Sequence, residues 1–270
     1  MDLITQTLKR AGKQHTRTLE NESPADRSMA TPASETEEPL IRSVAVPASQ
    51  LRRQKILTGY KNEPFIDAYR LLRTRVLGQM AANNRRTLGV TSANAHEGKS
   101  LTAINLGIAI AMEKDHSVIV VDTDLRRPSL HRYFGLRPIK GINDYLKGNS
   151  TLTEILVSPG IDHFAILPCL DAITGAPELL KSKMMHKLLA DISASFPTHT
   201  IIYDLAPILV GDDAVAFSFL VDAMILVVEE GKTEKDKLEM AKELLSESNL
   251  IGTVLNKVNK SKPDRNRCYY

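Results

Sequence analysis

The sequence has no tryptophan, two cysteines and no long uninterrupted hydrophobic run, and each scarcity excludes a class of protein. Cys169 and Cys268 lie far apart and fit neither a disulfide framework nor a zinc pattern, so we expect a reducing compartment. The most apolar stretches, Leu101 to Met112 and Ala214 to Val228, are short or interrupted by Asp222, and the N-terminus lacks the apolar core of a signal peptide. The chain is therefore not expected to cross a membrane by itself. A formal net charge of +3 is too small to indicate a nucleic-acid partner.

Composition divides the chain into three stretches. Met1 to Lys13 has apolar side chains at near-helical spacing, which suits either a short amphipathic helix that docks on a partner or a frayed chain end. His15 to Gln50 is mostly Ser, Thr, Pro, Ala and Glu, without an apolar period, and cannot bury enough surface to fold. We predict a disordered segment at 1–50, a folded domain at 51–258 and a flexible tail at 259–270.

A phosphate-binding loop is predicted between an apolar run and an apolar-periodic helix. The segment Thr91 to Ser100 fits the pattern G-x-x-x-x-G-K-[ST], with Ala93 in place of the first glycine. Backbone N–H groups in such a turn, and at the helix N-terminus that follows, point at phosphate oxygens. Lys99 would place its charge on the β- and γ-phosphates, and Ser100 would offer its hydroxyl to Mg²⁺. The candidate nucleotide-binding residues are Ala93, Asn94, Ala95, His96, Glu97, Gly98, Lys99, Ser100 and Leu101.

Apolar runs alternate with helical patterns along the rest of the domain. Continuous apolar runs are typical of strands buried on both faces of a parallel sheet. Such runs occur at 88–90, 117–122, 163–167, 200–203, 223–228 and 251–255, and helical patterns at 64–76, 101–114, 177–192, 213–220 and 233–246. The prediction is an α/β fold with a doubly wound, mostly parallel sheet of the P-loop NTPase type and helices on both faces.

Two of the predicted strands end in aspartate, at the edge of the sheet that would face the nucleotide. One reads V-I-V-V-D-T-D and ends in Asp122 and Asp124, and the other reads I-I-Y-D and ends in Asp204. Aspartate after a strand is often only a helix cap, but two such strands behind one phosphate loop favour a metal site. Lys99, Asp122, Asp124 and Asp204 would therefore lie together beside the phosphates. Ser100, Asp122 and Asp204 are the candidate Mg²⁺ ligands, and ATP with Mg²⁺ is the expected cofactor pair.

From about residue 63 to 258 the sequence resembles the bacterial tyrosine autokinases of capsule and exopolysaccharide systems, within the MinD/ParA-like group. Three motifs carry the resemblance in order: the loop ending Gly98-Lys99-Ser100, the D-x-D-x-R motif from Asp122 to Arg126, and the D-x-x-P motif from Asp204 to Pro207. Asn94 stands where ParA and MinD ATPases carry a signature lysine. Ala95-His96 replaces the kinases' usual Pro-Gly, and His96 suits either a solvated loop residue or a proton-transfer group.

The resemblance implies the chemistry of the site and its acceptors. The domain at 51–258 would be a P-loop kinase domain in which Asp122 accepts the proton of a tyrosine hydroxyl, Asp124 supports it and Asp204 holds the metal. Asn256 would read the adenine edge, or would simply end a strand in a turn. The acceptors would be Tyr269 and Tyr270, phosphorylated in trans.

The resemblance also implies partners. Asp67, Arg70 and Arg73 resemble an E-x-x-R-x-x-R motif that joins subunits in a ring, with Asp67 in place of the glutamate. An intrahelical ion pair would use the same spacing. The kinase would be cytoplasmic and recruited to the inner face of the membrane by a separate chain-length-determinant-like activator, and a cognate tyrosine phosphatase would reverse it. The alternatives are a MinD/ParA-like ATP-dependent binding switch and a nucleotide-binding scaffold without kinase activity.

Overall fold

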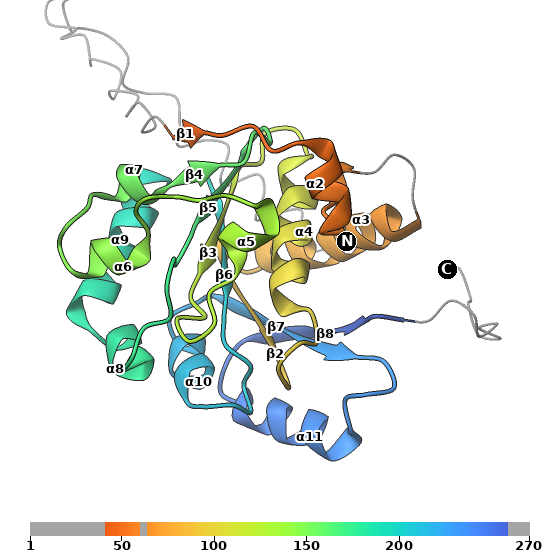
Figure 1. The fold of residues 1–270 in the computed structure, drawn as a ribbon. Coiled ribbons are helices and arrows are strands. Elements are labelled where there is room, and N and C mark those ends of the chain that lie inside the picture. Colours follow the sequence, from red (N-terminus) through yellow and green to blue (C-terminus); the bar gives the residue numbers. More distant parts are fainter. Residues whose placement is uncertain (1–40, 60–63, 259–270) are drawn as a thin grey trace, which may run out of the picture. The chain divides into compact units, whose positions relative to one another are not determined.

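The computed structural model describes residues 41–59 and 64–258, which include the whole predicted P-loop region (Figure 1). The predicted amphipathic segment at Met1 to Lys13 and the tail that carries Tyr269 and Tyr270 lie outside the described residues. Within the described ranges, no helix is both long and apolar enough to cross a bilayer.

An eight-stranded sheet forms the centre of the domain, in the order β1-β4-β5-β3-β6-β2-β7-β8. Its strands are β1 (Arg42–Ser43), β2 (Thr87–Ser92), β3 (Val118–Asp122), β4 (Val157–Ser158), β5 (Phe164–Leu167), β6 (Thr200–Asp204), β7 (Ala223–Glu229) and β8 (Leu250–Asn256). All neighbouring pairs are parallel except β4 and β5. The predicted α/β class and its six strands are confirmed, and β1 and β4 are additional.

Helices cover both faces of this sheet (Figure 1). They are α2 (Ala48–Arg53), the 3₁₀ turn η1 (Leu57–Gly59), α3 (Pro64–Ala81), α4 (Lys99–Ala111), α5 (Leu130–Phe134), α6 (Ile142–Leu146), α7 (Leu152–Ile155), α8 (Ala176–Leu180), α9 (Lys183–Ser195), α10 (Asp213–Ser218) and α11 (Lys235–Leu244). The single helix predicted at 177–192 is wrong, because the Ser182 hydroxyl accepts the N–H of Met185 at 3.1 Å and begins a new helix, α9.

Alternate side chains of the buried strands enter two separate hydrophobic cores. On β3, Val118 and Val120 pack with the helices α3, α4 and α5, whereas Ile119 and Val121 pack with α6 to α11. The period of two follows from the strand itself, since successive side chains point to opposite faces. Two well-filled cores hold the central strands rigidly and fix the positions of their carboxyl ends.

Ordered structure begins earlier than the sequence predicts. Residues 41–50, expected to belong to a disordered segment, contain β1 and the start of α2. Arg42 pairs with Val157 of β4, and Val44 and Val46 pack against the core on the α3 and α4 face. A two-residue strand supplies no apolar period, so its place in the sheet depends on contacts with residues more than a hundred positions away.

Candidate active site

The predicted phosphate loop joins β2 to α4 above the carboxyl edge of the sheet. β2 lies between β6 and β7, so both neighbouring strands end beside the loop. Gly98 precedes α4 with a φ of +96°, which favours glycine, and a Cβ there would lie 2.1 Å from the amide nitrogen of Asn256. The thirteen-residue helix α4 then directs its free N–H groups and its positive dipole end at the loop. The geometry is that of an anion site.

A buried carboxylate braces the loop from inside. The Glu97 side chain accepts hydrogen bonds from the backbone N–H and the side-chain amide of Asn94, both at 2.9 Å, and from the Thr233 hydroxyl at 2.6 Å. Glu97 is almost fully buried, with 1% of its surface exposed. Asn94 is therefore turned into its own loop. Thr233, which follows β7, was not among the candidates from the sequence.

The end of β8 holds the same loop from outside. The Asn256 amide donates to the Glu97 carbonyl at 2.8 Å, and the Lys257 ammonium donates to the His96 carbonyl at 2.6 Å. Lys257 also pairs with Glu229 at 2.9 Å. In this conformation Asn256 contacts the loop backbone, so its reading of an adenine edge stays a prediction. Lys257 is a second contact that sequence reasoning missed.

The three predicted aspartates converge on Lys99. The lysine ammonium lies 2.8 Å from Asp124, 3.4 Å from Asp204 and 3.3 Å from the Ser100 hydroxyl. Asp122 and Asp204 are register partners on the adjacent strands β3 and β6, and neither is exposed to solvent. One buried cation thus faces three buried carboxylates.

This concentration of charge shifts the acid–base behaviour of the cluster. Burial alone would lower the pKa of Lys99, but attraction to Asp204 and Asp124 outweighs it and the pKa is raised. Burial and repulsion by Asp204 raise the pKa of Asp122 well above its usual range, although N–H donors from Leu130 and Ser129 oppose the shift. Burial likewise raises the pKa of Asp204, against the opposing charge of Lys99. The lysine stays charged, and the carboxyls of Asp122 and Asp204 hold protons more readily than ordinary aspartates.

Two carboxylate oxygens are placed where a cation could bind. Asp122 Oδ1 and Asp204 Oδ2 are buried and lack a hydrogen-bond partner within the described part of the chain. Unpaired buried oxygens of this kind fit Mg²⁺, which prefers oxygen ligands. Among the described residues, no three His, Cys, Asp or Glu side chains group closely enough to hold a metal by themselves. A Mg²⁺ here would therefore need Ser100, water or phosphate oxygens as further ligands.

An ion pair ties together the two loops that carry the aspartates. The Arg126 guanidinium, in the loop after β3, binds both carboxylate oxygens of Asp213 at the start of α10. Asp213 is nearly buried, whereas the Arg126 side chain is 43% exposed. Asp213 has no pattern in the sequence that would have marked it.

The predicted subunit-contact residues on α3 are not all on the surface. Asp67 and Arg70 form an exposed ion pair at 3.1 Å. Arg73 turns inward instead, pairing with Glu113 at 2.8 Å and donating to the Ala109 carbonyl at 3.0 Å, and only 17% of its side chain is exposed. Arg73 thus connects α3 to the end of α4. Of the three predicted subunit-contact residues, Asp67 and Arg70 are the two that another chain could contact.

Sequence comparisons agree with this geometry. Residues 88–267 match the family model of the CobQ/CobB/MinD/ParA nucleotide binding domain. The tyrosine-protein kinase YwqD of Bacillus subtilis (strain 168) is 32% identical over 192 residues, which are 70% of this chain and 80% of that protein. The chain belongs to the bacterial tyrosine-protein kinase family. This confirms the family resemblance that the three motifs predict.

Solved kinase structures share the fold. The chimerical protein CapA2B2 superposes with a TM-score of 0.68 and 25% identity, over 84% of this chain and 97% of that one. The kinase domain of the Escherichia coli tyrosine kinase ETK gives a TM-score of 0.68 at 24% identity, over 89% of this chain and all of that one. The bacterial tyrosine kinase fold therefore extends over most of the chain, including the segment N-terminal to β2.

Proposed function

We propose that this kinase transfers the γ-phosphoryl group of ATP to Tyr269 and Tyr270 of a second copy of itself, with Mg²⁺ as the metal. The observation that carries the proposal is the buried Lys99 among Asp122, Asp124 and Asp204, directly beside the phosphate loop. Phosphoryl transfer depends mainly on positioning and on neutralising phosphate charge, and this cluster offers both.

Each residue would have one task. The loop N–H groups and Lys99 would hold the phosphates, and Ser100, Asp122 and Asp204 would hold Mg²⁺, which supplies charge neutralisation when bound. Asp122 would take the proton of the tyrosine hydroxyl while the phenolate oxygen bonds to the γ-phosphorus and the bond to ADP breaks.

Lys99 would change partners when ATP binds. In the structure its ammonium is engaged by Asp124 at 2.8 Å. The triphosphate carries several negative charges and would compete with Asp124 for the same ammonium, so Asp124 acts as a holder of Lys99 between turnovers. Asn256 and Lys257 would keep the loop backbone in place during this exchange.

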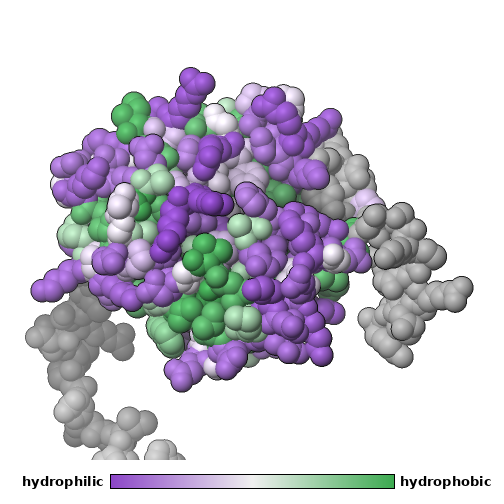
Figure 2. All heavy atoms as spheres, turned by 60° about the horizontal axis from the view of Figure 1, so that its bottom comes forward, coloured by the Kyte–Doolittle hydropathy of each residue, from purple (hydrophilic) through white to green (hydrophobic). Residues whose placement is uncertain are grey.

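The partners proposed for the kinase are a membrane-bound chain-length-determinant-like activator, further copies in a ring, and a cognate tyrosine phosphatase. The likeness to CapA2B2 supports the activator, because CapA2B2 is a chimerical protein. Figure 2 supports association with another chain, since hydrophobic residues gather on the face that it displays. Near α10, Val210 and Phe219 are 56% and 59% exposed. The kinase would act in the cytoplasm, at the inner face of the membrane, and regulate exopolysaccharide or capsule synthesis or export.

The direct test is autophosphorylation of the purified full-length chain. It is incubated with Mg-ATP, with and without the cytoplasmic tail of the activator, and phosphate is mapped by mass spectrometry. We expect phosphotyrosine at Tyr269 and Tyr270 that disappears in Lys99→Met and in Asp122→Asn. Absence of phosphate on both tyrosines in the parent chain with activator present would falsify the acceptor assignment.

The same experiment separates the two alternatives. A MinD/ParA-like switch would release phosphate to water and bind a partner only with ATP. Asn94 disfavours this reading, because its side chain is bonded to Glu97 within its own loop and is not a lysine. A scaffold would bind nucleotide in a separate titration, but would form no phosphotyrosine in the parent chain.

A further inference from the structure

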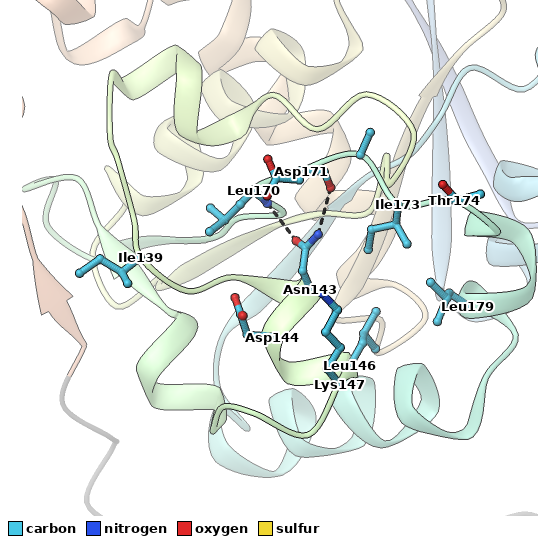
Figure 3. Close-up of a pocket in the computed structure, with 11 residues that line it drawn as sticks. Ile139, Asn143, Asp144, Leu146, Lys147, Leu170, Asp171, Ile173, Thr174 and Leu179 are labelled. Carbon is cyan, nitrogen blue, oxygen red and sulfur yellow. Dashed lines mark hydrogen bonds between the residues drawn. The ribbon is translucent and has the colours of Figure 1, made fainter.

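Figure 3 shows a hollow lined by residues of α6 and of the segment that follows β5. In the strand order, β5 lies on the side of β3 away from the phosphate loop. The hollow has a volume of about 400 Å³ and lies between α6 and the segment that runs from β5 to α8. Ile139, Leu146 and Ile173 give it apolar walls, and Asp144, Asp171 and Lys147 line it with charge. The phosphate loop and its bracing residues contribute nothing to this hollow.

The wall of the hollow is fixed by hydrogen bonds. The Asn143 side chain accepts the N–H of Leu170 at 3.0 Å and donates to the carbonyl of Asp171 at 3.0 Å (Figure 3). Ile173 donates its N–H to the carbonyl of Leu125, in the loop after β3, at 2.8 Å. The hollow is thus preformed and attached to the loop that carries the catalytic aspartates.

The sheet register places the hollow close to Asp122. Val121 pairs with Leu167, so Asp122 lies level with Pro168, and Asp171 follows three residues later. With about 3.3 Å per residue and 4.8 Å between strands, the Cα atoms of the two aspartates are about 11 Å apart if the chain continues along the strand direction, and at most roughly 15 Å apart. A peptide whose tyrosine reaches Asp122 would therefore place residues two to four positions away in the hollow.

The charges of the hollow suit a basic peptide. Asp171 is exposed and forms no ion pair within the described residues, and Asp144 uses one oxygen to accept the N–H of Gly141. Two carboxylates thus face a single lysine, Lys147. The chain's own tail ends Arg265-Asn-Arg267-Cys-Tyr269-Tyr270, with arginines four and two residues before Tyr269. In an extended chain those arginines lie about 13 and 7 Å from the tyrosine.

We propose that this hollow binds the Arg265-Asn-Arg267 segment of a second copy while that copy's Tyr269 or Tyr270 reaches Asp122. The inference rests on the proposed tyrosine kinase function and adds the determinant by which the acceptor is recognised. Asp171 pairs with an arginine, and the apolar walls contact the neighbouring side chains of the tail.

Direction selects the second copy over the chain's own tail. The tail leaves the domain after β8, and β8 lies five strand positions from β5, with the phosphate loop between them. The twelve residues after Val258 reach about 40 Å when extended, so length alone permits both routes. A chain's own tail would pass over the phosphate loop before its tyrosines reach Asp122. Its arginines, which precede the tyrosines, would then lie on the phosphate-loop side of Asp122. Only a tail that arrives from the β5 side places its arginines in the hollow.

The test uses full-length chains in two roles. The enzyme copy carries Tyr269→Phe and Tyr270→Phe, and the substrate copy carries Lys99→Met, so phosphate appears on the substrate only by transfer in trans. Asp171→Asn in the enzyme copy should lower the rate about two- to fivefold, as expected for one exposed charge pair. The same change in the substrate copy should have no effect. Asp162→Asn, at the opposite end of β5, is the matched control and should transfer at the parent rate.

A binding measurement keeps the inference separate from the kinase function. A labelled peptide of residues 259–270 with both tyrosines changed to phenylalanine is titrated into the full-length chain, and fluorescence anisotropy is followed. Asp171→Arg should weaken binding, and Arg265→Glu with Arg267→Glu in the peptide should restore it. Equal binding by the parent and Asp171→Arg overturns the inference, whether or not phosphotyrosine forms. Asp171-dependent binding without phosphotyrosine in the parent supports the site and refutes the kinase function.

Discussion

The two sides of Asp122 differ in how completely their polar groups are engaged. On the phosphate-loop side, Lys99, Glu97 and Asn256 are each bonded to several partners, and Lys99 and Glu97 are buried. On the β5 side, Asp171 is exposed without an ion pair in the described part of the chain, beside an open hollow. We call the phosphate-loop side the tight side and the β5 side the open side. The tight side suits a small ligand that always has the same shape. The open side suits a peptide that must enter and leave.

The largest effect expected on the tight side comes from removing its buried cation. Lys99→Met should reduce tyrosine phosphorylation by about 10²–10³-fold. The fixed positive charge of Lys99 stabilises the phosphoryl group in the transition state, and a single such group contributes to the rate on that scale. The measurement is the initial rate of phosphotyrosine formation at saturating Mg-ATP. Lys114→Met, an exposed lysine just beyond α4, is the control and should keep the parent rate. A Lys99→Met rate within threefold of the parent would show that the buried cluster is structural.

Removing the support from β8 should have the next largest effect. Asn256→Ala deletes the 2.8 Å bond to the Glu97 carbonyl, and a net loss of about 1 kcal/mol corresponds to roughly fivefold weaker nucleotide binding. Titration with non-hydrolysable ATP and GTP analogues separates the two tasks of this residue. If Asn256 only supports the loop, its loss weakens the binding of both analogues equally. If it also reads adenine, its loss weakens the binding of the ATP analogue more.

Asn249→Ala is the control for this prediction. Asn249 is exposed just before β8 begins, and its backbone carbonyl accepts the N–H of Met224, while its side chain has no hydrogen bond within residues 41–59 and 64–258. Unchanged affinity in Asn256→Ala, matching Asn249→Ala, would mean that Lys257 and Glu97 hold the loop without help.

The tight side was largely predictable from the sequence, because its residues lie at the ends of strands and at the start of a helix. Lys99, Asp122 and Asp204 follow directly on apolar strands or precede an apolar helix, and parallel strands bring such ends together. Thr233 and Lys257 were missed because they are polar loop residues whose role depends on β7 and β8 lying next to β2. The same applies to β1 and β4, each two residues long, which carry no period of their own.

On the open side, the residues of the hollow could not be predicted from the sequence. β5 was predicted from its apolar run, but Asp171 and Asn143 have neither motif nor period. They come together because Asn143 on α6 binds the backbone after β5, a contact across 27 or 28 residues of sequence. Hydrophobic pattern predicts which elements pack, whereas the shape left between them depends on side chains that the pattern does not constrain.

The electrostatic cost of the tight side should be measurable as pH-dependent stability. Burial and repulsion from Asp204 raise the pKa of Asp122 in the folded chain above its unfolded value of about 3.9. The favourable contribution of this carboxyl is therefore complete below about pH 4 and is lost as the pH rises through the folded pKa. Asp122→Asn avoids that loss, so at pH 7.5 without Mg²⁺ or nucleotide it should melt about 2–4 °C higher, the effect of roughly 1 kcal/mol.

The dependence on pH provides the control. The difference in melting temperature between Asp122→Asn and the parent should shrink toward zero as the pH approaches 4. A constant difference for Asp122→Asn at all pH values would point to a packing effect instead.

The smallest expected effect concerns the backbone of the phosphate loop. His96 has a φ of +67°, a left-handed conformation that costs a residue with a Cβ roughly 1–2 kcal/mol, part of which is offset because glycine loses more conformational entropy on folding. His96→Gly should therefore raise the melting temperature by about 2 °C. Ala95 is not among the residues with positive φ, so Ala95→Gly should lower it by a similar amount. If both substitutions lower the melting temperature equally, the hydrogen bond from Lys257 to the His96 carbonyl requires the restricted backbone of a residue other than glycine at position 96. The tight side would then need that local strain to hold its shape.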